Sequence, residues 1–435
     1  MSRHTNRREF FRNSALAGVG IWIAGTGTAA DKQSPNEKLN IGIIGASGRG
    51  GSNTRSVSSE NIVALCDVDQ KRLAKAAQNY PKAKKYEDWR KAVDHKNLDA
   101  VVVSTTDHTH ALACVWAMKR GLSAYCEKPL AHSVHEARVM QDTYKANKDK
   151  LATQMGTQIH ATANYRRVVE LVQSGAVGSV REAHVWCARN GLADGERPKD
   201  QPPVPPNLNW DLWLGPAPWR PYHPRYMPGC TTWEQWWDFG NGCLGDMGSH
   251  LIDLPFWALK LRDPLTAEAE GAQLRAETYP QWLKIRWEHP ARGDMPACKL
   301  LWYDGIQRPE VAVPGHDLKK LHKGILFIGD KGMLLADYGY WKLLPEEKFK
   351  GFKPPEPSIP PSLGHHKEWL HGAKTGAPTL CNFDYSGKLV ENNLLGTVAF
   401  RVSKKLEWDP ATLKAKNCPE ADKYIRREYR KGWTL

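Results

Sequence analysis

The sequence predicts two domains in series: a doubly wound α/β domain with a parallel sheet, then a second α/β domain with an open, mainly antiparallel sheet. From residue 39 to residue 155, short apolar runs alternate with segments of helical length, which is the pattern of right-handed βαβ units. After Gly156, the strand candidates alternate apolar and polar residues, which is typical of a sheet with one solvated face. A chain of 435 residues is long enough for two such domains.

The elements of the first domain, residues 36–156, are apolar runs bounded by turn residues. Strands are expected at 39–44, 62–67, 100–104, 123–126 and 151–155, and helices at 70–79, 110–120 and 132–147. Leu39 to Ile44 is apolar and leads directly into a glycine-rich turn, so it is expected to be a buried strand.

The second domain, residues 157–435, contains a proline-rich loop at 202–206. Its strands are expected at 180–186, 282–287, 297–302 and 325–329, and a helix at 389–401. The free face of such a sheet needs a cover, so we expect a homo-oligomer, either a dimer or a tetramer.

Residues 1–30 have the features of a twin-arginine export signal. Arg7 and Arg8 precede an apolar stretch at 15–24, and small residues follow at 25–30. We therefore expect export to the periplasm or cell envelope; the alternative is an amphipathic helix of the mature protein. No other apolar run is long enough to span a bilayer, so no stable membrane insertion is expected after signal removal.

The composition argues against two classes of function. The formal net charge is +14, but the Lys and Arg residues are dispersed and accompany no nucleic-acid-binding motif, so no nucleic-acid partner is expected. The nine Cys include no C-x-x-C pair. His365 and His366 are adjacent, and neighbouring residues point to different sides of a helix, so no metal site is predicted.

Gly45 to Gly51 follows the first strand and approximates the pattern G-x-G-x-x-G. Gly45 and Gly50 occupy the outer positions, while Ser47 stands at the middle one with Gly48 beside it. The pattern brings bare backbone close to a pyrophosphate at a helix N-terminus. Asp67 ends the next strand, where an acidic residue receives the ribose hydroxyls and favours NAD. Arg49 could instead meet a 2′-phosphate, so NADP stays open; a flavodoxin-like turn without ligand is the other alternative.

Two further motifs carry reactive side chains. Glu127-Lys128-Pro129 lies at the end of a predicted parallel strand, where ligands bind in such sheets. Asp246 and His250 are four residues apart and share one face of a helix, which makes His250 a candidate base. The alternatives are a solvated strand end for the first motif and a capped helix start with a structural His for the second.

With these motifs in this order, residues 39–400 resemble the Gfo/Idh/MocA family of oxidoreductases, in particular an exported subgroup that bears twin-arginine signals. The resemblance also rests on Cys66-Asp67-Val68-Asp69 and on Thr106-Asp107-His108-Thr109-His110. It implies that Lys128 contacts cofactor and substrate, and that Asp246 and His250 lie at the reacting hydroxyl. His250 would accept the hydroxyl proton while a hydride passes to the nicotinamide. The expected cofactor contacts are Gly45, Ser47, Gly48, Arg49, Gly50, Asp67, Thr105, His108, His110, Glu127 and Lys128.

A tryptophan-rich stretch from Trp210 to Gly242 precedes Asp246 and resembles the exported subgroup. Aromatic faces stack on the apolar faces of sugar rings, so we expect a carbohydrate or polyol substrate. The alternative is that these Trp residues fill a loop core or a subunit interface. The expected substrate contacts are Gln158, His160, Trp237 and Asp253.

The favoured function is oxidation of a sugar or polyol CH–OH group with a tightly bound NAD that is recycled in place. The twin-arginine route moves folded proteins, so a cofactor would travel with the chain. The alternative is an NAD-dependent glycoside hydrolase or lyase that oxidises transiently, eliminates, adds water and reduces again. A non-catalytic sensor is the third possibility, and the joint presence of Lys128, Asp246 and His250 argues against it.

Overall fold

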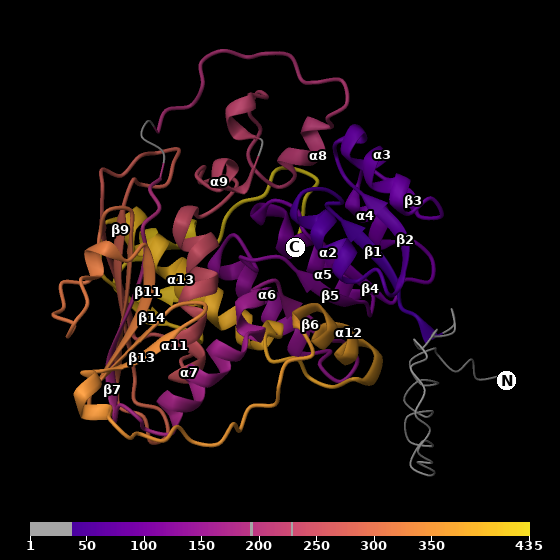
Figure 1. Ribbon diagram of the computed structural model, residues 1–435. Helices are drawn as coiled ribbons and strands as arrows, with labels where there is room; N and C mark the ends of the chain where they lie inside the picture. The colour runs from indigo at the N-terminus through magenta and orange to yellow at the C-terminus, as the bar shows by residue number, and fades with distance from the viewer. Residues whose placement is uncertain (1–36, 192–194, 228) are drawn as a thin grey trace, which may run out of the picture.

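The computed structural model describes residues 37–191, 195–227 and 229–435, which form two domains (Figure 1). The predicted signal at residues 1–30 lies outside the described residues. Within them, no helix is both long and apolar enough to cross a membrane.

The N-terminal domain is built on a parallel sheet with the strand order β3-β2-β1-β4-β5-β6. The strands are β1 (Asn40–Ile44), β2 (Asn61–Cys66), β3 (Lys84–Tyr86), β4 (Ala100–Val103), β5 (Ser123–Cys126) and β6 (Thr153–Met155). This order is that of dinucleotide-binding domains, and it reverses direction between β1 and β4. The predicted doubly wound parallel sheet is confirmed. The edge strand β3 was not predicted because its two Lys residues are exposed and give no apolar run.

The helices of this domain begin at residues whose side chains accept hydrogen bonds from the first turn. Asp69 caps α3 (Gln70–Asn79), and Ser133 forms a capping box with Glu136 at the start of α6 (Val134–Lys145). The remaining helices are α2 (Arg49–Ser56), α4 (Trp89–Val93) and α5 (Asp107–Lys119). The first turn of α5 consists of buried polar residues, which give no apolar signal, so the sequence placed the start of this helix at residue 110.

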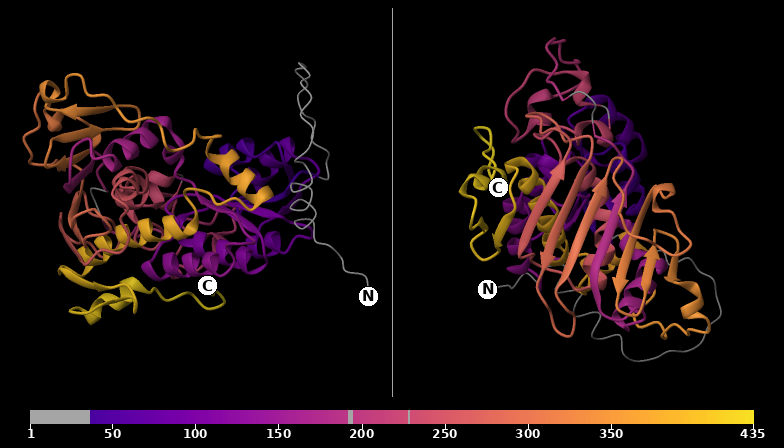
Figure 2. Two further views of the ribbon diagram at one scale, coloured as in Figure 1. Left: turned by 90° about the horizontal axis from the view of Figure 1, so that it is seen from below. Right: turned by 90° about the vertical axis from the view of Figure 1, so that its left-hand side faces the viewer.

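The second domain contains a nine-stranded sheet with the order β13-β12-β11-β7-β10-β9-β8-β14-β15. Its strands are β7 (Val180–Cys187), β8 (Thr266–Gly271), β9 (Leu283–His289), β10 (Cys298–Asp304), β11 (Lys323–Gly329), β12 (Met333–Ala336), β13 (Trp341–Leu344), β14 (Leu406–Asp409) and β15 (Lys414–Ala415). All neighbours are antiparallel except β7 and β10. The predicted open, mainly antiparallel sheet is confirmed, and its uncovered face is seen in Figure 2.

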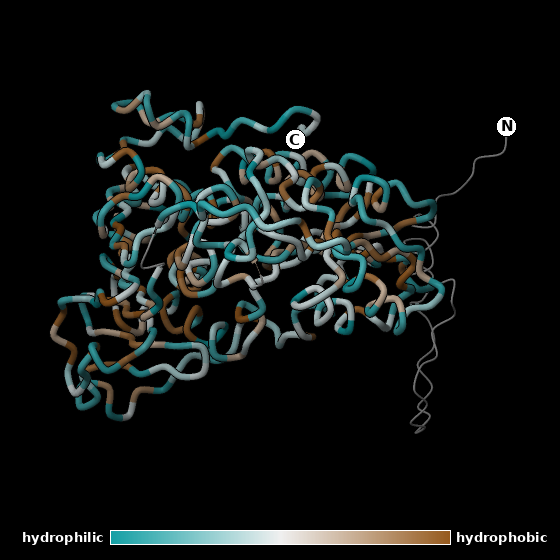
Figure 3. The backbone as a smooth tube through the Cα atoms, turned by 90° about the horizontal axis from the view of Figure 1, so that it is seen from above, coloured by the Kyte–Doolittle hydropathy of each residue, from teal (hydrophilic) through white to brown (hydrophobic). Residues whose placement is uncertain are grey.

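The other face of this sheet meets the helices of the second domain. These are α7 (Ala163–Gln173), α11 (Asp253–Ala258) and the long α13 (Phe383–Val402), which packs against β8 on one side and α6 on the other. Because α13 lies between the two domains, it is buried on almost every side. Figure 3 shows the hydrophobic segments inside the molecule, with hydrophilic residues on the outlying loops.

One helix of the C-terminal half returns to the first domain. In α12 (His365–Thr375), Trp369, Leu370 and Ala373 join the apolar cluster around Ile41 and Val102. This helix therefore packs on the first domain although it comes late in the chain. The remaining short elements are η2 (Gln158–Ala161), α8 (Trp210–Leu214), η3 (Pro224–Tyr226), α9 (Cys230–Trp233), η4 (Leu244–Gly248), α10 (Ser249–Leu251), η5 (Leu318–Lys320), η6 (Glu346–Phe349), η7 (Pro419–Ala421) and α14 (Asp422–Ile425).

Candidate active site

A cavity of about 270 Å³ opens at the carboxyl ends of β1, β2 and β4, where ligands bind in open parallel sheets. Six residues predicted to contact a cofactor line it: Gly45, Ser47, Gly48, Arg49, Asp67 and Thr105. Its other wall comes from the second domain and includes Leu208 and, from the tryptophan-rich stretch, Trp213 and Trp233. The cavity thus lies between the two domains.

The glycine-rich turn has the geometry that a pyrophosphate needs. A Cβ at Gly50 would overlap the carbonyl oxygen of Gly45, and one at Gly45 would lie 2.5 Å from the carbonyl oxygen of Ser104. Gly48 has φ 57° and open space beside it, and no side chain caps the helix α2 that it precedes. The first-turn N–H groups of α2 are therefore available to an anion. Ser47 is tolerated because the positive φ falls on Gly48.

Asp67 follows β2 and faces the same cavity. Its carboxylate accepts hydrogen bonds from the backbone N–H groups of Ala46 (3.2 Å) and Asp69 (3.1 Å), and burial raises its pKa. This places an acceptor for ribose hydroxyls beside the glycine turn. Arg49, the expected alternative partner of a 2′-phosphate, has its Nε 2.9 Å from Glu127 Oε1. The residues present therefore fit NAD.

A segment of the second domain, residues 207–213, crosses the cavity, and we call it the strap. Gln70 N donates to the carbonyl of Asn207 (2.8 Å), Asn209 N donates to that of Val68 (2.9 Å), and Asn207 Nδ2 donates to Asp69 Oδ1 (3.0 Å). The strap is thereby fixed to the turn that carries Asp67. Within it, Trp210 stacks on Trp213 with ring centroids 4.7 Å apart. Several of the Trp residues thus form a loop core, as the alternative interpretation had it.

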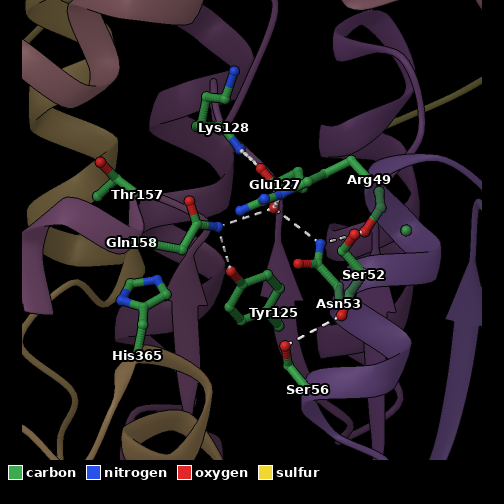
Figure 4. Close-up of polar contacts among 12 residues, drawn as sticks. Arg49, Ser52, Asn53, Ser56, Tyr125, Glu127, Lys128, Thr157, Gln158 and His365 are labelled. Carbon is green, nitrogen blue, oxygen red and sulfur yellow. Dashed lines mark hydrogen bonds and ion pairs between the residues drawn. The ribbon is translucent and has the colours of Figure 1, made fainter.

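Glu127 connects three neighbouring segments (Figure 4). Its Oε1 accepts hydrogen bonds from Arg49 Nε, Asn53 Nδ2 (2.9 Å) and Gln158 Nε2 (3.1 Å). Gln158 also donates to the hydroxyl of Tyr125 (3.0 Å). The carboxylate therefore holds the end of β5 against α2 and η2, and Gln158, a predicted substrate contact, lies in this group.

Beyond Glu127, side chains of alternating charge form a row of ion pairs. The row consists of Lys128, Asp246, Arg189 and Glu234. Lys128 Nζ forms an ion pair with Asp246 Oδ1, and Arg189 pairs with Asp246 Oδ2. The other terminal nitrogen of Arg189 lies 2.7 Å from Glu234 Oε1. Asp246 is on η4, which is a π-helix and not the ordinary α-helix that the sequence predicted. Such single-turn π segments are frequent at functional sites.

His250, on α10, is held as a neutral base. The hydroxyl of Thr157 donates to the carbonyl of Ser249 (3.0 Å), so its oxygen accepts from His250 Nδ1, also at 3.0 Å. The ring proton is therefore on Nδ1, and Nε2 keeps its lone pair. Burial first, and then the charge of Lys128, lower the pKa of His250 well below its ordinary value.

Because the pKa of His250 is lowered, we expect the rate of sugar oxidation to fall at acid pH only below the usual titration range of histidine. Protonation of Nε2 would abolish the base, and a lower pKa moves that loss to lower pH. The rate at which a sugar reduces bound NAD in a single turnover should therefore hold as the pH falls through about 6.5, the usual histidine value. Stopped-flow absorbance of reduced nicotinamide measures this; a half-maximal rate at or above that pH would contradict it.

Five predicted cofactor contacts are not among the residues that line the cavity: Gly50, His108, His110, Glu127 and Lys128. His108 is buried with Nε2 3.1 Å from the carbonyl of Trp213. His110 is also buried, with Nδ1 2.8 Å from the carbonyl of Pro129 and Nε2 3.1 Å from that of Thr105. Both therefore support loops that border the site: the strap and the turns that carry Thr105 and Lys128.

Three predicted substrate contacts have partners within the protein. His160 Nδ1 lies 2.9 and 3.0 Å from the carboxylate oxygens of Asp253, whose Oδ1 also accepts from Tyr385 (2.7 Å). Trp237 is buried and donates to the carbonyl of Arg275 (3.1 Å). His160, Asp253 and Cys381 lie close enough together to supply three metal ligands. The hydrogen bonds to Asp253 give this group a structural role in joining η2, α11 and α13.

The two adjacent histidines differ in their partners. His365 Nε2 is 2.9 Å from the carbonyl of Met155, whereas His366 Nε2 is 3.0 Å from Asn53 Oδ1. Their rings are perpendicular. They therefore point to different surroundings, as adjacent positions on a helix require.

Comparison with known proteins agrees with this geometry. The family model described as "Oxidoreductase family, NAD-binding Rossmann fold" matches residues 39–155, and the family's "C-terminal alpha/beta domain" matches residues 167–302. Together they cover more than half of the chain. The protein belongs to the Gfo/Idh/MocA family of oxidoreductases. Its first domain is thus a Rossmann domain of the NAD-binding kind.

Three curated relatives of this Gfo/Idh/MocA member match in part. Levoglucosan dehydrogenase of Pseudarthrobacter phenanthrenivorans is 24% identical over 236 residues, which is 50% of each chain. Inositol 2-dehydrogenase 3 of Saccharopolyspora erythraea is 31% identical over 34% of this chain and 44% of its own. A glycosyl hydrolase family 109 protein of Solibacter usitatus is 32% identical over 33% and 37%. The chain spans half or less of the length of these relatives.

Solved structures show the same fold over most of the chain. GenD2 from gentamicin A biosynthesis, in complex with NAD, has a TM-score of 0.59 at 16% identity and covers 90% of this chain and 100% of its own. Levoglucosan dehydrogenase in complex with NADH and levoglucosan has a TM-score of 0.55 at 15% identity, with 85% and 99% covered.

Proposed function

We propose that this protein oxidises a CH–OH group of a sugar or polyol, with NAD as the hydride acceptor. The observation that carries the proposal is the ion pair of Lys128 with Asp246 in the same site as His250. The Nδ1 of His250 is bonded to Thr157, and its Nε2 has no hydrogen-bond partner among the described residues. The names of the partial relatives, levoglucosan and inositol dehydrogenases, support a polyhydroxylated substrate.

Each residue has a role that follows from its state of charge. The Lys128 ammonium stabilises the developing negative charge on the carbinol oxygen. His250 Nε2 accepts the hydroxyl proton, and Thr157 fixes the ring through Nδ1. Asp246, which also pairs with Arg189, orients Lys128. Bound NAD would supply the hydride acceptor, held by the glycine turn and Asp67.

A panel of sugars and polyols added to the purified protein tests this function. We expect at least one compound to raise the absorbance of reduced nicotinamide without added cofactor. A protein with bound NAD that responds to no compound would refute the proposal.

We also propose that the NAD is resident and is recycled in place. The strap closes the cavity from the second domain, and a signal at residues 1–30 that directs export would require a cofactor that stays bound. Mass spectrometry of the ligand released from denatured protein should find about one NAD per chain. A protein that is purified empty would contradict residency while leaving the oxidation chemistry open.

The strap allows a sharper test of residency. Asn207→Ala removes a hydrogen bond to the charged Asp69, worth about 1.5–3 kcal/mol, so bound NAD should dissociate about tenfold faster or more. Asn164→Ala is the matched control, because Asn164 Nδ2 donates to the carbonyl of Asp337 in the second domain, far from the strap in the chain. Equal dissociation rates for both variants would show that the strap does not retain the cofactor.

A second candidate function is cleavage of a glycoside by transient oxidation, elimination, addition of water and reduction. The partial relative named as a glycosyl hydrolase and the carboxyl group of Glu234 favour it. Release of a chromogenic aglycone without added NAD distinguishes this function from net oxidation.

The uncovered face of the nine-stranded sheet supports a homo-oligomer, in which that face meets a second copy (Figure 2). Light scattering of the purified protein tests this proposal. A monomer at micromolar concentration would overturn it.

A further inference from the structure

Glu234 is a buried carboxyl group in the candidate active site that the oxidation chemistry does not use. Its side chain is 2% exposed. Its Oε1 accepts hydrogen bonds from Arg189 (2.7 Å) and Gln235 Nε2 (3.0 Å). Oε2 accepts none from the described part of the chain. One carboxylate oxygen is therefore fixed, and the other is left for a group that the protein does not provide.

The backbone around Glu234 is held tightly. Gly242 N donates to the carbonyl of Glu234 (2.8 Å), and Glu234 N donates to that of Cys230 (3.0 Å). A Cβ at Gly240 would overlap the Cα of Glu234, so glycine is required for this close approach. The carboxyl group thus has a defined position, as a group that transfers protons needs.

The charged groups around Glu234 come from several elements. Arg189 follows β7, Lys128 follows β5, Asp246 lies on η4 beyond Arg189, and Asp107 begins α5. Burial raises the pKa of Glu234 to about 7, although Arg189 and Lys128 act in the opposite direction. Near neutral pH, the carboxyl group therefore exchanges a proton readily.

We propose that Glu234 is the second proton-transfer group of this site and protonates a departing substrate oxygen, distinct from the hydroxyl that His250 serves. The inference rests on the proposed sugar site and favours its glycoside-cleaving form. A simple oxidation releases one proton from one hydroxyl, and His250 accounts for it. The carboxyl group of Glu234 is a second proton-transfer group, and it would transfer its proton to a second substrate oxygen.

The proton balance closes over a turnover. After oxidation of a neighbouring hydroxyl to a ketone, the C–H bond beside that ketone gives its proton to water, and its electron pair forms a C=C bond as the C–O bond to the leaving group breaks. The electron pair of the C–O bond goes to the departing oxygen, and the Glu234 carboxylic acid supplies the proton that makes this group an alcohol. A water molecule then gives its hydroxyl to the same carbon and its proton to the Glu234 carboxylate, the neighbouring carbon regains a proton from water, and the hydride and the proton held by His250 return to the ketone. Glu234 returns to its acid form, and the hydrolysis causes no net oxidation or reduction.

The test compares two steps in wild-type protein and in Glu234→Gln. The first is reduction of bound NAD by a chromogenic glycoside in a single turnover, and the second is release of the aglycone. In wild type, release should fall as the pH rises above about 7, because the acid form is lost, whereas reduction should show no such limb. In Glu234→Gln, release should be about 100-fold slower and lose this limb, with reduction within about threefold of wild type.

Glu277→Gln is the matched control, because Glu277 pairs with Arg197 and Arg220 outside this row of charges. It should leave both steps and the pH limb unchanged. Equal release rates in wild type and Glu234→Gln would overturn the proposal, as would a wild type that reduces NAD but releases no aglycone. If Glu234→Gln fails to fold, the pH profiles of reduction and release in the wild type test the proposal. A release rate that does not fall above about pH 7 would then overturn it. Failure of every sugar to reduce bound NAD would instead refute the proposed function.

Discussion

Lys128→Met is expected to lower turnover about 1000-fold, while the protein keeps its fold and its bound NAD. The substitution removes the cation that stabilises the carbinol oxygen as its proton leaves. It also removes one of the two partners of Asp246, but Arg189 still pairs with that carboxylate. The loss should therefore fall on kcat more than on stability.

The measurement is single-turnover reduction of NAD by the best sugar of the panel, together with the dinucleotide content and the melting temperature. Lys148→Met is the control, since Lys148 is exposed on the loop after α6 and should leave the rate unchanged. A Lys128→Met protein that turns over at the wild-type rate would remove Lys128 from the chemistry and undermine the proposed function.

Gly50→Ala should yield protein with less than about a tenth of the wild-type dinucleotide content, whereas Gly51→Ala should bind NAD normally. At Gly50 the new methyl group would overlap the carbonyl oxygen of Gly45, which is backbone and cannot move without opening the turn. At Gly51 the nearest atom would be the carbonyl oxygen of Ala46 at 3.6 Å, an ordinary contact. Because both residues lie in α2, helix propensity favours alanine by about 1 kcal/mol at each.

This pair of variants separates steric obstruction at the turn from a general effect on the helix. Dinucleotide content by mass spectrometry and thermal unfolding with and without added NAD are the readouts. Added NAD should raise the melting temperature of Gly51→Ala but not that of Gly50→Ala. Similar NAD content in both variants would show that the turn does not hold the pyrophosphate as proposed.

The elements of the fold that could be predicted are those with a local signal. Residues 70–79 and 123–126 match α3 and β5 because apolar periodicity and turn residues bound both. The edge strand β3 was missed because its stability comes from pairing with β2, which leaves no pattern in Lys84–Tyr86. The start of α13 was placed six residues late because the helix is buried all round, and burial on every side removes the periodicity.

The same contrast applies to the site. Lys128, Asp246 and His250 stand in motifs, so they could be named from the sequence. Arg189 and Glu234 could not, because they reach the site through contacts with residues distant in the chain. The one local sign of Glu234 was its place in the tryptophan-rich stretch that precedes Asp246. Trp237 was expected to meet substrate, but only packing decides which aromatic residues of such a stretch face a cavity.

The position of the strap beside the cavity links the order in which the chain folds to the entry of the nucleotide. Residues 207–213 are synthesised after the six strands of the parallel sheet, and they form hydrogen bonds with the turn between β2 and α3. Under the proposed residency, a nucleotide that enters before the strap docks would be retained when folding is complete, and one that enters later would have to displace this segment of the second domain. Loading would thus be coupled to maturation of the chain. Under the proposed residency, a cell would commit one dinucleotide to each molecule it makes, so synthesis of the protein draws directly on its NAD pool.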